Sequence, residues 1–240
     1  MPEPSTHSPF GRLTSRSYRY GYLLAALALV IFVRPFLTNH ELGPLSLDIF
    51  LYASLLTGAL AGATRPRQAV LTWALVGLAV ALRVVWRSSD ATWALVAFLA
   101  VAALVHAIVA FLLLRTLFRR RSGIDADTLQ GAVAVYLLIG VTWTFAFALL
   151  ELLEPGSFQL ADNPASMQDQ FSRLIGFSFT TLTTLGYGNV HPVTPRADAL
   201  ATAEAISGVF YVGVLVARLI GIQIAEHSLR LSQPDHPESE

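Results

Sequence analysis

The stretch TTLTTLGYGNV, residues 180–190, places two glycines around a tyrosine inside a chain that is otherwise strongly apolar. Of the 240 residues, 54% are hydrophobic and 13% are charged, whereas the charged share of a soluble domain is about 25%. The composition indicates a membrane protein. The question is whether this glycine-rich stretch is an ordinary turn or a functional site.

Composition also excludes several classes of function. The chain has no cysteine, so it can build neither a disulfide framework nor a thiolate metal site. A formal net charge of zero gives no reason to expect a nucleic-acid partner. All the basic residues are arginine, and together with the abundance of alanine this indicates a bacterial source.

Six apolar spans come close to the length of about 20 residues that a helix needs to cross a bilayer. They lie at residues 20–37, 45–63, 69–86, 91–114, 129–153 and 197–225. The first is the weakest, because its clean core ends at Arg34 and Pro35, and a signal peptide is the rival interpretation. No small-x-small cleavage site follows it, so we interpret it as a helix.

Arginine placement predicts the orientation, because cytoplasmic loops are enriched in positive charge. With six helices both termini lie on one side, and most arginines fall there. These are Arg12, Arg16, Arg19, Arg65, Arg67, Arg115, Arg119, Arg120, Arg121, Arg218 and Arg230, against Arg34, Arg83, Arg87, Arg173 and Arg196 on the other side. We therefore expect both termini in the cytoplasm.

Residues 155–196, between the last two spans, are too many for a tight connection. Their first part is polar and rich in turn residues, whereas FSRLIGFSFTTLTT, residues 171–184, has the pattern of an amphipathic helix too short to span. Such a helix is predicted to be re-entrant. Non-helical backbone at membrane depth is tolerated only where protein buries it or where it lines a watery path.

The two glycines suit a cation site made of backbone carbonyls. Aiming consecutive carbonyls at one axis requires positive φ, which glycine adopts at little cost, and Gly186 and Gly188 supply it. The carbonyls of Thr184, Leu185, Gly186 and Tyr187 would form the sites, with the Thr184 hydroxyl as a further oxygen. The Leu185 and Tyr187 side chains would point away and brace the loop against the short helix.

TTLGYG resembles the selectivity filter of potassium channels, in which carbonyl oxygens replace the hydration shell of the ion. The resemblance covers residues 127–225 in the family's order of outer helix, pore helix, filter and inner helix. It implies K+ bound at Thr184, Leu185, Gly186 and Tyr187, with Gly188 completing the filter. It also implies a homotetramer, since each chain has one filter loop, with K+ as the permeant ion and no cofactor.

The sequence departs from the family around the filter. Leu185 stands where valine or isoleucine is common, and Asn189 replaces a common aspartate. Thr180 falls where some members have glutamate, and Phe177 where tryptophan is common. We therefore expect the brace behind the filter to be neutral and hydroxyl-based at these positions, and we assign support of the filter to Thr180, Thr183, Asn189 and Glu204.

Glu204 is an ionisable residue at membrane depth, which by default is a functional hypothesis. The alternative, which we favour, is a hydrogen bond to a pore-helix hydroxyl such as Ser178 or Thr181. Gly208 falls at the family's hinge position, where hinge and helix packing are equally good interpretations. Val212, Val216 and Ile220 are expected on the face toward the axis.

The predicted fold is an all-α membrane protein with six transmembrane helices. Its parts are a cytoplasmic N-terminus (1–19), a four-helix domain (20–122), a pore domain (123–226) and a disordered cytoplasmic tail (227–240), with no ligand-binding domain. We predict a non-enzymatic, potassium-selective channel in the cell membrane, surrounded by lipid and without a nucleic-acid partner. A weakly selective monovalent cation channel is the alternative. A potassium-uptake transporter, an intramembrane hydrolase and a non-conducting subunit fit less well.

The fourth span predicts weak voltage dependence. Each charge crossing the field contributes about 2.3 kcal/mol per 100 mV, and voltage-gated tetramers move about 3 to 4 charges per subunit. Residues 91–114 contain no arginine, and His106 is their one titratable residue. Single-channel recordings in symmetric K+ should show an open probability that varies shallowly with voltage. A steep curve that flattens when Arg83 and Arg87 are neutralised would contradict this prediction.

Overall fold

The computed structural model describes residues 66–119, 126–160 and 166–231, together with residues 21, 23–28 and 31. Four of its helices are long and apolar enough to cross a membrane: α3 (Pro66–Ser89), α4 (Thr92–Arg119), α5 (Ala126–Leu153) and α7 (Pro195–Leu231). These correspond to the last four expected spans. The expected span at 45–63 lies outside the described residues, and the part of 20–37 that is described is helical.

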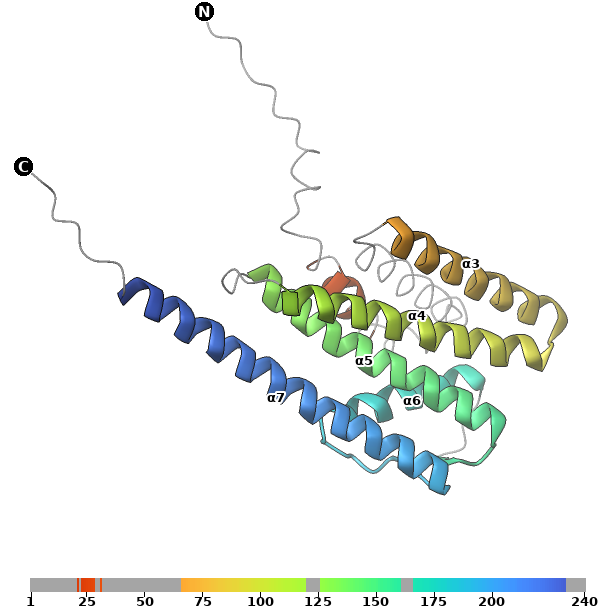
Figure 1. The fold of residues 1–240 in the computed structure, drawn as a ribbon. Coiled ribbons are helices and arrows are strands. Elements are labelled where there is room, and N and C mark those ends of the chain that lie inside the picture. Colours follow the sequence, from red (N-terminus) through yellow and green to blue (C-terminus); the bar gives the residue numbers. More distant parts are fainter. Residues whose placement is uncertain are drawn as a thin grey trace, which may run out of the picture.

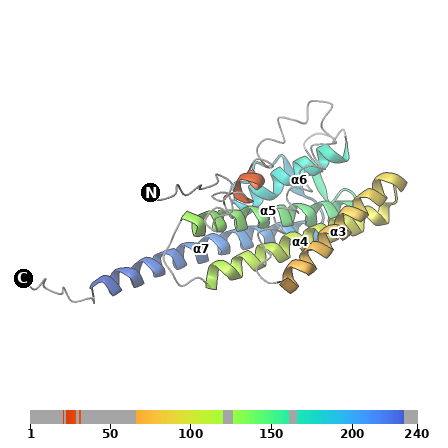
Figure 2. The same cartoon turned by 90° about the horizontal axis from the view of Figure 1, so that it is seen from above.

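The helices form layers around α5. Helices α3 and α4 make an antiparallel hairpin joined at Asp90, whose φ of 51° turns the chain sharply. Helix α5 packs against α4 on one side and against α6 (Met167–Leu182) and α7 on the other (Figures 1 and 2). Helix α7 extends past the start of the expected tail at residue 227, and its C-terminal end projects beyond the bundle.

Apolar side chains fill the space between α3, α4 and α5. Phe98, Val105 and Leu138 are buried there. His106 lies among them, with Nδ1 2.7 Å from the Ala102 carbonyl and its ring centroid 5.1 Å from that of Phe145. His106 is therefore a buried, packed side chain.

Helix α6 has 16 residues, about 24 Å at 1.5 Å per residue, and is shorter than the roughly 30 Å hydrocarbon core. It begins one turn before the expected start at 171, because Ser166 caps it by accepting a hydrogen bond from the Asp169 N–H. Helix α6 therefore has the short length that a re-entrant helix requires.

A strand pair that the sequence interpretation missed brackets α6. Strands β1 (Phe158–Leu160) and β2 (Val190–Pro192) are antiparallel, with Phe158 opposite Pro192 and Leu160 opposite Val190. The chain after α6 thus returns to lie beside the strand that precedes α6. Three-residue strands are too short for their alternation to be recognised in a sequence, so the all-α expectation needs this small correction.

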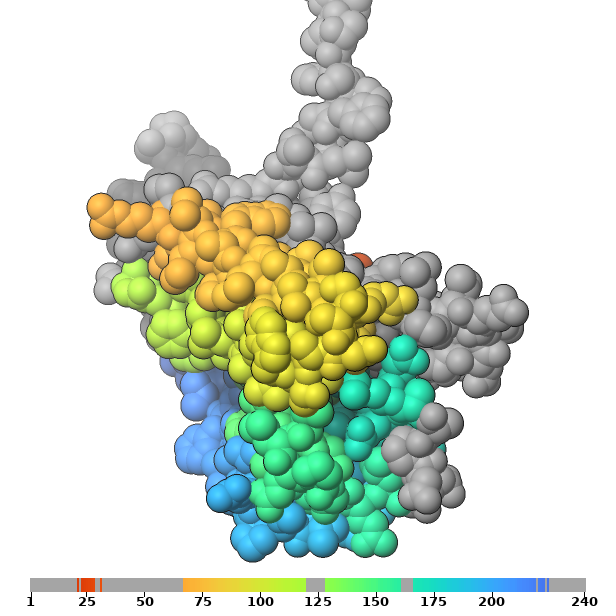
Figure 3. Space-filling view, turned by 90° about the vertical axis from the view of Figure 1, so that its right-hand side faces the viewer, coloured from red at the N-terminus to blue at the C-terminus, as the bar shows by residue number. Residues whose placement is uncertain are grey.

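A cluster of aromatic rings supports the strand pair. Phe147 of α5, Phe158 of β1 and Phe177 of α6 have ring centroids 5.1 to 5.5 Å apart. Such edge-to-face and tilted pairs add to the stabilisation from burial. The end of α5 and the starts of α6 and α7 lie on the same side of the molecule as the turn between α3 and α4 (Figures 1 and 3).

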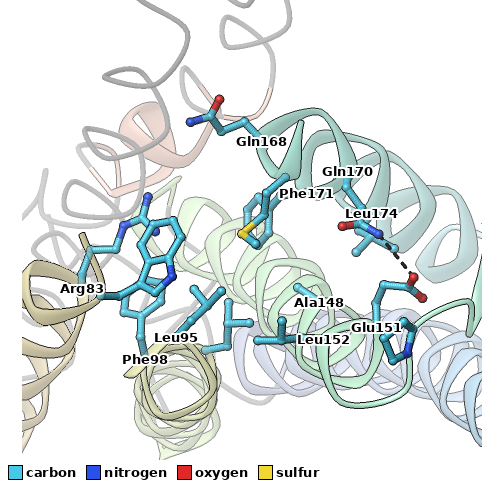
Figure 4. Close-up of a pocket in the computed structure, with 14 residues that line it drawn as sticks. Arg83, Leu95, Phe98, Ala148, Glu151, Leu152, Gln168, Gln170, Phe171 and Leu174 are labelled. Atoms are coloured by element: carbon cyan, nitrogen blue, oxygen red, sulfur yellow. Dashed lines mark hydrogen bonds between the residues drawn. The ribbon is translucent and has the colours of Figure 1, made fainter. Parts of the chain in front are cut away.

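The Glu151 carboxylate organises the turn after α5. It accepts hydrogen bonds from Gly156 N (2.9 Å) and Phe158 N (3.0 Å), one on each oxygen. The Gln170 side-chain amide of α6 also donates to it at 3.3 Å (Figure 4). One side chain therefore joins the end of α5, the start of β1 and the first half of α6.

Glu151→Gln should lower the melting temperature of the detergent-solubilised protein. The amide NH2 would face a backbone N–H, and hydrogen bonds to charged groups contribute about 1.5 to 3 kcal/mol each. Glu154→Gln is the matched control, because Glu154 pairs with Arg196 at the exposed surface, where an ion pair contributes at most about 1 kcal/mol. Equal shifts for the two variants would contradict this role of Glu151.

Candidate functional site

The segment after α6 has an unusual backbone. Thr184, Gly186 and Gly188 have φ values of 58°, 58° and 78°. Leu185 and Tyr187, between them, are not in the positive region. The positive φ expected at the two glycines is confirmed, and Thr184 was not foreseen. A residue with a Cβ is held in this region at a cost of about 1 to 2 kcal/mol, which is typical of functional sites.

The carbonyls at the end of α6 hold the start of this segment. Thr180 O accepts hydrogen bonds from Leu185 N (2.7 Å) and Gly186 N (3.2 Å), and Thr181 O accepts one from Thr184 N (2.9 Å). Phe179 O accepts one from Thr183 N, and Leu182 O one from the Tyr136 hydroxyl of α5. All four terminal carbonyls, which usually lack partners at a helix end, are therefore satisfied.

The side chains of the segment are exposed in the single chain. Residues 183–189 all lie at the surface, with 56% of Leu185 and 74% of Tyr187 exposed. This exposure gives no support within one chain to the expected bracing of these two side chains against the short helix, which stays a prediction.

The expected support residues differ in what they do. The Thr180 and Thr183 hydroxyls donate to Phe177 O (3.0 Å) and Phe179 O (2.6 Å), which are carbonyls of α6 itself. Thr180 instead contacts the segment through its backbone carbonyl. Asn189 is exposed. A role of these hydroxyls and of Asn189 in supporting the segment stays a prediction.

Glu204 of α7 is buried between helices. Its Oε1 is within hydrogen-bonding distance of Ser178 Oγ of α6, and both side chains are 0% exposed. The hydrogen bond that we favoured for Glu204 is thus present, with Ser178 rather than Thr181 as its partner. Glu204 Oε2 has no partner.

Gly208 lies one turn after Glu204, against the end of α6. A Cβ at this position would be 2.2 Å from the Leu182 carbonyl oxygen and 3.0 Å from Leu182 Cδ1. The structure therefore supports the packing interpretation of Gly208, and the hinge remains a prediction. Helix α7 is continuous through this residue.

Further along α7, toward its C-terminal end, a row of apolar side chains is open in the single chain. Val212, Val216 and Ile220, spaced four residues apart, are each about half exposed. They form one stripe, as the sequence pattern indicated. Their position toward an axis depends on other copies of the chain and stays a prediction.

Two tyrosines that sequence reasoning missed join α5 to its neighbours. Tyr136 donates from its hydroxyl to Leu182 O at 3.1 Å, and Tyr211 donates to Ala132 O at 2.6 Å. Their ring centroids are 5.6 Å apart. A tyrosine in an apolar helix signals a buried hydrogen bond, but the sequence does not show which carbonyl accepts it.

A cavity of about 270 Å³ lies away from the glycine-rich segment. The ends of α3, α4 and α5 and the start of α6 line it, with Arg83, Phe98 and Phe171 among its side chains (Figure 4). Arg83 is buried beside the rings of Trp86 and Phe98. None of the predicted site residues contributes to this cavity.

Residues 137–223 match the model of a protein family described as ion channel. The match begins within α5, includes α6 and the glycine-rich segment, and ends within α7. No curated protein and no solved structure matches the chain. The family match supports an ion-channel likeness for residues 137–223, and the four apolar helices indicate a membrane protein.

Gly208→Ala should destabilise the protein, because the new methyl group meets backbone that cannot rotate away, and overpacking costs about 1 to 3 kcal/mol. Gly213→Ala in the same helix is the control, since a Cβ there meets nothing within 4 Å. Thermal unfolding in detergent should show a lower melting temperature for Gly208→Ala alone. If both variants melt like the wild type, the close contact is not important for stability.

Proposed function

We propose that four copies of this chain form a potassium-selective channel, with the carbonyls of Thr184, Leu185, Gly186 and Tyr187 as the ion sites. The family match supplies the premise that residues 137–223 belong to an ion channel. The observation that supports the filter is the positive φ at every second residue from Thr184 to Gly188. An extended strand would direct successive carbonyls to opposite sides, whereas alternating φ breaks that pattern.

The surface of the single chain supports assembly into a tetramer. Leu185 and Tyr187 are large, exposed side chains beside the proposed filter, and the stripe of Val212, Val216 and Ile220 is open below it. One filter segment provides one quarter of a ring of carbonyls. Four copies around an axis would place these carbonyls around an ion and cover the exposed side chains.

Conduction in this proposal is passive and lacks an arginine-bearing voltage sensor. Helix α4 carries no arginine before Arg115, near its C-terminal end. Moving charge through the field is what makes opening steeply voltage-dependent. We place the channel in a bacterial cell membrane as a multi-pass protein with both termini in the cytoplasm, on the basis of the arginine distribution.

A weakly selective monovalent cation channel is the rival function. The two proposals differ in the response to sodium, because a potassium filter requires the carbonyls to replace the hydration shell of K+ better than that of Na+. Proteoliposomes with equal K+ or Na+ gradients and a membrane-potential dye separate them. Flux driven by K+ alone supports the proposal, and equal flux with both ions contradicts it.

Gly186→Ala should abolish potassium flux while leaving assembly intact. Its φ of 58° is strained for any residue with a Cβ, at a cost of about 1 to 2 kcal/mol per chain, and relief of this strain would turn a carbonyl away from the ion. Gly77→Ala in α3 is the matched control, because a Cβ there also meets nothing within 4 Å but φ is not positive.

Light scattering of the purified variants checks that both have the wild-type mass. Selective potassium flux that persists in Gly186→Ala would contradict the assignment of the filter. Loss of flux in Gly77→Ala as well would point to general damage.

A further inference from the structure

The Glu204 carboxyl group has no task in the conduction pathway proposed above. It lies between α6 and α7, fully buried, with Ser178 Oγ beside Oε1 and no partner for Oε2. Burial is complete within one chain, so a second copy could not bring a cation to it without rearrangement. Its protonation state must therefore be explained by the groups already around it.

Counting protons around Ser178 gives that state. Ser178 Oγ is 2.7 Å from the Gly140 carbonyl of α5 and is also close to Glu204 Oε1. The Gly140 carbonyl, which also accepts from the Thr144 hydroxyl at 2.9 Å, has no proton to donate, so for both short contacts of Ser178 to be hydrogen bonds the single Ser178 proton goes to this carbonyl. The contact with Glu204 is then a hydrogen bond only if Glu204 donates a proton.

The surroundings do not compensate an ionised carboxylate. The polar side chains of α5 and α6 in this region include Tyr136, Trp143 and Ser178, none of them charged, and of these three Ser178 is the one that contacts the Glu204 carboxyl group. The Tyr136 hydroxyl donates its hydrogen bond to Leu182 O, and the Trp143 indole donates to Ser207 Oγ. Among the described residues no arginine pairs with Glu204. Burying an unpaired charge is far more costly than burying a neutral acid.

The contact between Glu204 and Ser178 lies close to the packed Gly208 and to the carbonyl that holds the proposed filter. Glu204 and Gly208 are four residues apart on one face of α7, and Ser178 and Leu182 are four apart on the facing side of α6. Residues four apart in a helix lie one above the other. The two pairs therefore form successive contacts between the helices, and Thr180, whose carbonyl accepts hydrogen bonds from Leu185 N and Gly186 N, lies between Ser178 and Leu182 in α6.

We propose that Glu204 is an un-ionised carboxylic acid whose O–H donates a hydrogen bond to Ser178 Oγ, and that this hydrogen bond positions the pore helix and the selectivity filter. Glu204 is a positioning residue in this proposal, because it acts on the filter through α6. The filter part of the proposal rests on the proposed channel function. The assignment of a proton to Glu204 does not depend on that function.

The first experiment tests positioning with two variants of similar size. In Glu204→Gln the amide N–H can still donate to Ser178, whereas Glu204→Met has no donor. In proteoliposomes, Glu204→Gln should keep the K+ over Na+ selectivity of the wild type, and Glu204→Met should lose about tenfold of it, which corresponds to one lost hydrogen bond of about 1.4 kcal/mol. Equal loss in both variants, or wild-type behaviour of Glu204→Met, would overturn the proposal.

The second experiment tests the proton without conduction. Infrared spectra at neutral pH should contain the C=O stretching band of an un-ionised carboxylic acid, and Glu204→Gln should remove it. Glu154→Gln, which alters an acid paired with Arg196, should leave it in place. A spectrum in which Glu204→Gln removes no such band would overturn the assignment of the proton.

Hydrogen exchange separates a failure of this proposal from a failure of the channel function. The Leu185 and Gly186 amides are bonded to Thr180 O, so their exchange reports on the filter position even in a protein that conducts no ions. They should exchange faster in Glu204→Met and at the wild-type rate in Glu204→Gln. Absence of flux in the wild type, together with this exchange pattern, would reject the channel function and leave the positioning role standing. Identical exchange in all three proteins would overturn the positioning role.

Discussion

The contact between the last turn of α6 and Gly208 of α7 is the constraint on which the rest of the site depends. No Cβ fits between the two helices here, because its place is 2.2 Å from the Leu182 carbonyl oxygen. The Tyr136 hydroxyl of α5 binds the same carbonyl from another direction. The end of α6 is thereby fixed between α5 and α7, and residues 183–189 start from that fixed point through the Thr180 carbonyl.

A second set of contacts fixes the other end of the segment. Strand β2 returns to β1, and Glu151 joins β1 to α5 and α6. The aromatic cluster of Phe147, Phe158 and Phe177 packs beneath them. Both ends of the segment are therefore held by buried contacts, whereas residues 183–189 between them remain exposed in one chain. This division fits the proposed assembly, in which only the middle of the segment would need neighbouring copies.

The polar groups inside the bundle follow the rule that buried donors and acceptors are paired. Tyr211, Trp143 and Ser178 each reach an acceptor on a neighbouring helix. In an apolar surrounding such bonds are expensive to lose, so they fix which faces of the helices meet. Among the described residues, Glu204 Oε2 is a buried oxygen without a hydrogen-bond partner. Burying such an oxygen costs less free energy when the carboxyl group is neutral than when it is ionised.

The sequence by itself determined the class of protein and the outline of the site. Apolar length predicted the four described helices that are long enough to span a membrane, and the short amphipathic pattern predicted α6 to within about one turn. The two glycines predicted positive φ, because backbone preference is a local property. Only the tertiary structure decided the β1–β2 pair, the exposure of Leu185 and Tyr187, the packing of Gly208 and the partner of Glu204. The reason is that these depend on contacts between residues far apart in the chain, such as 26 positions for Ser178 and Glu204 and 46 for Tyr136 and Leu182. Periodicity and residue type indicate which face of a helix is buried, but not which carbonyl or side chain of another helix it meets.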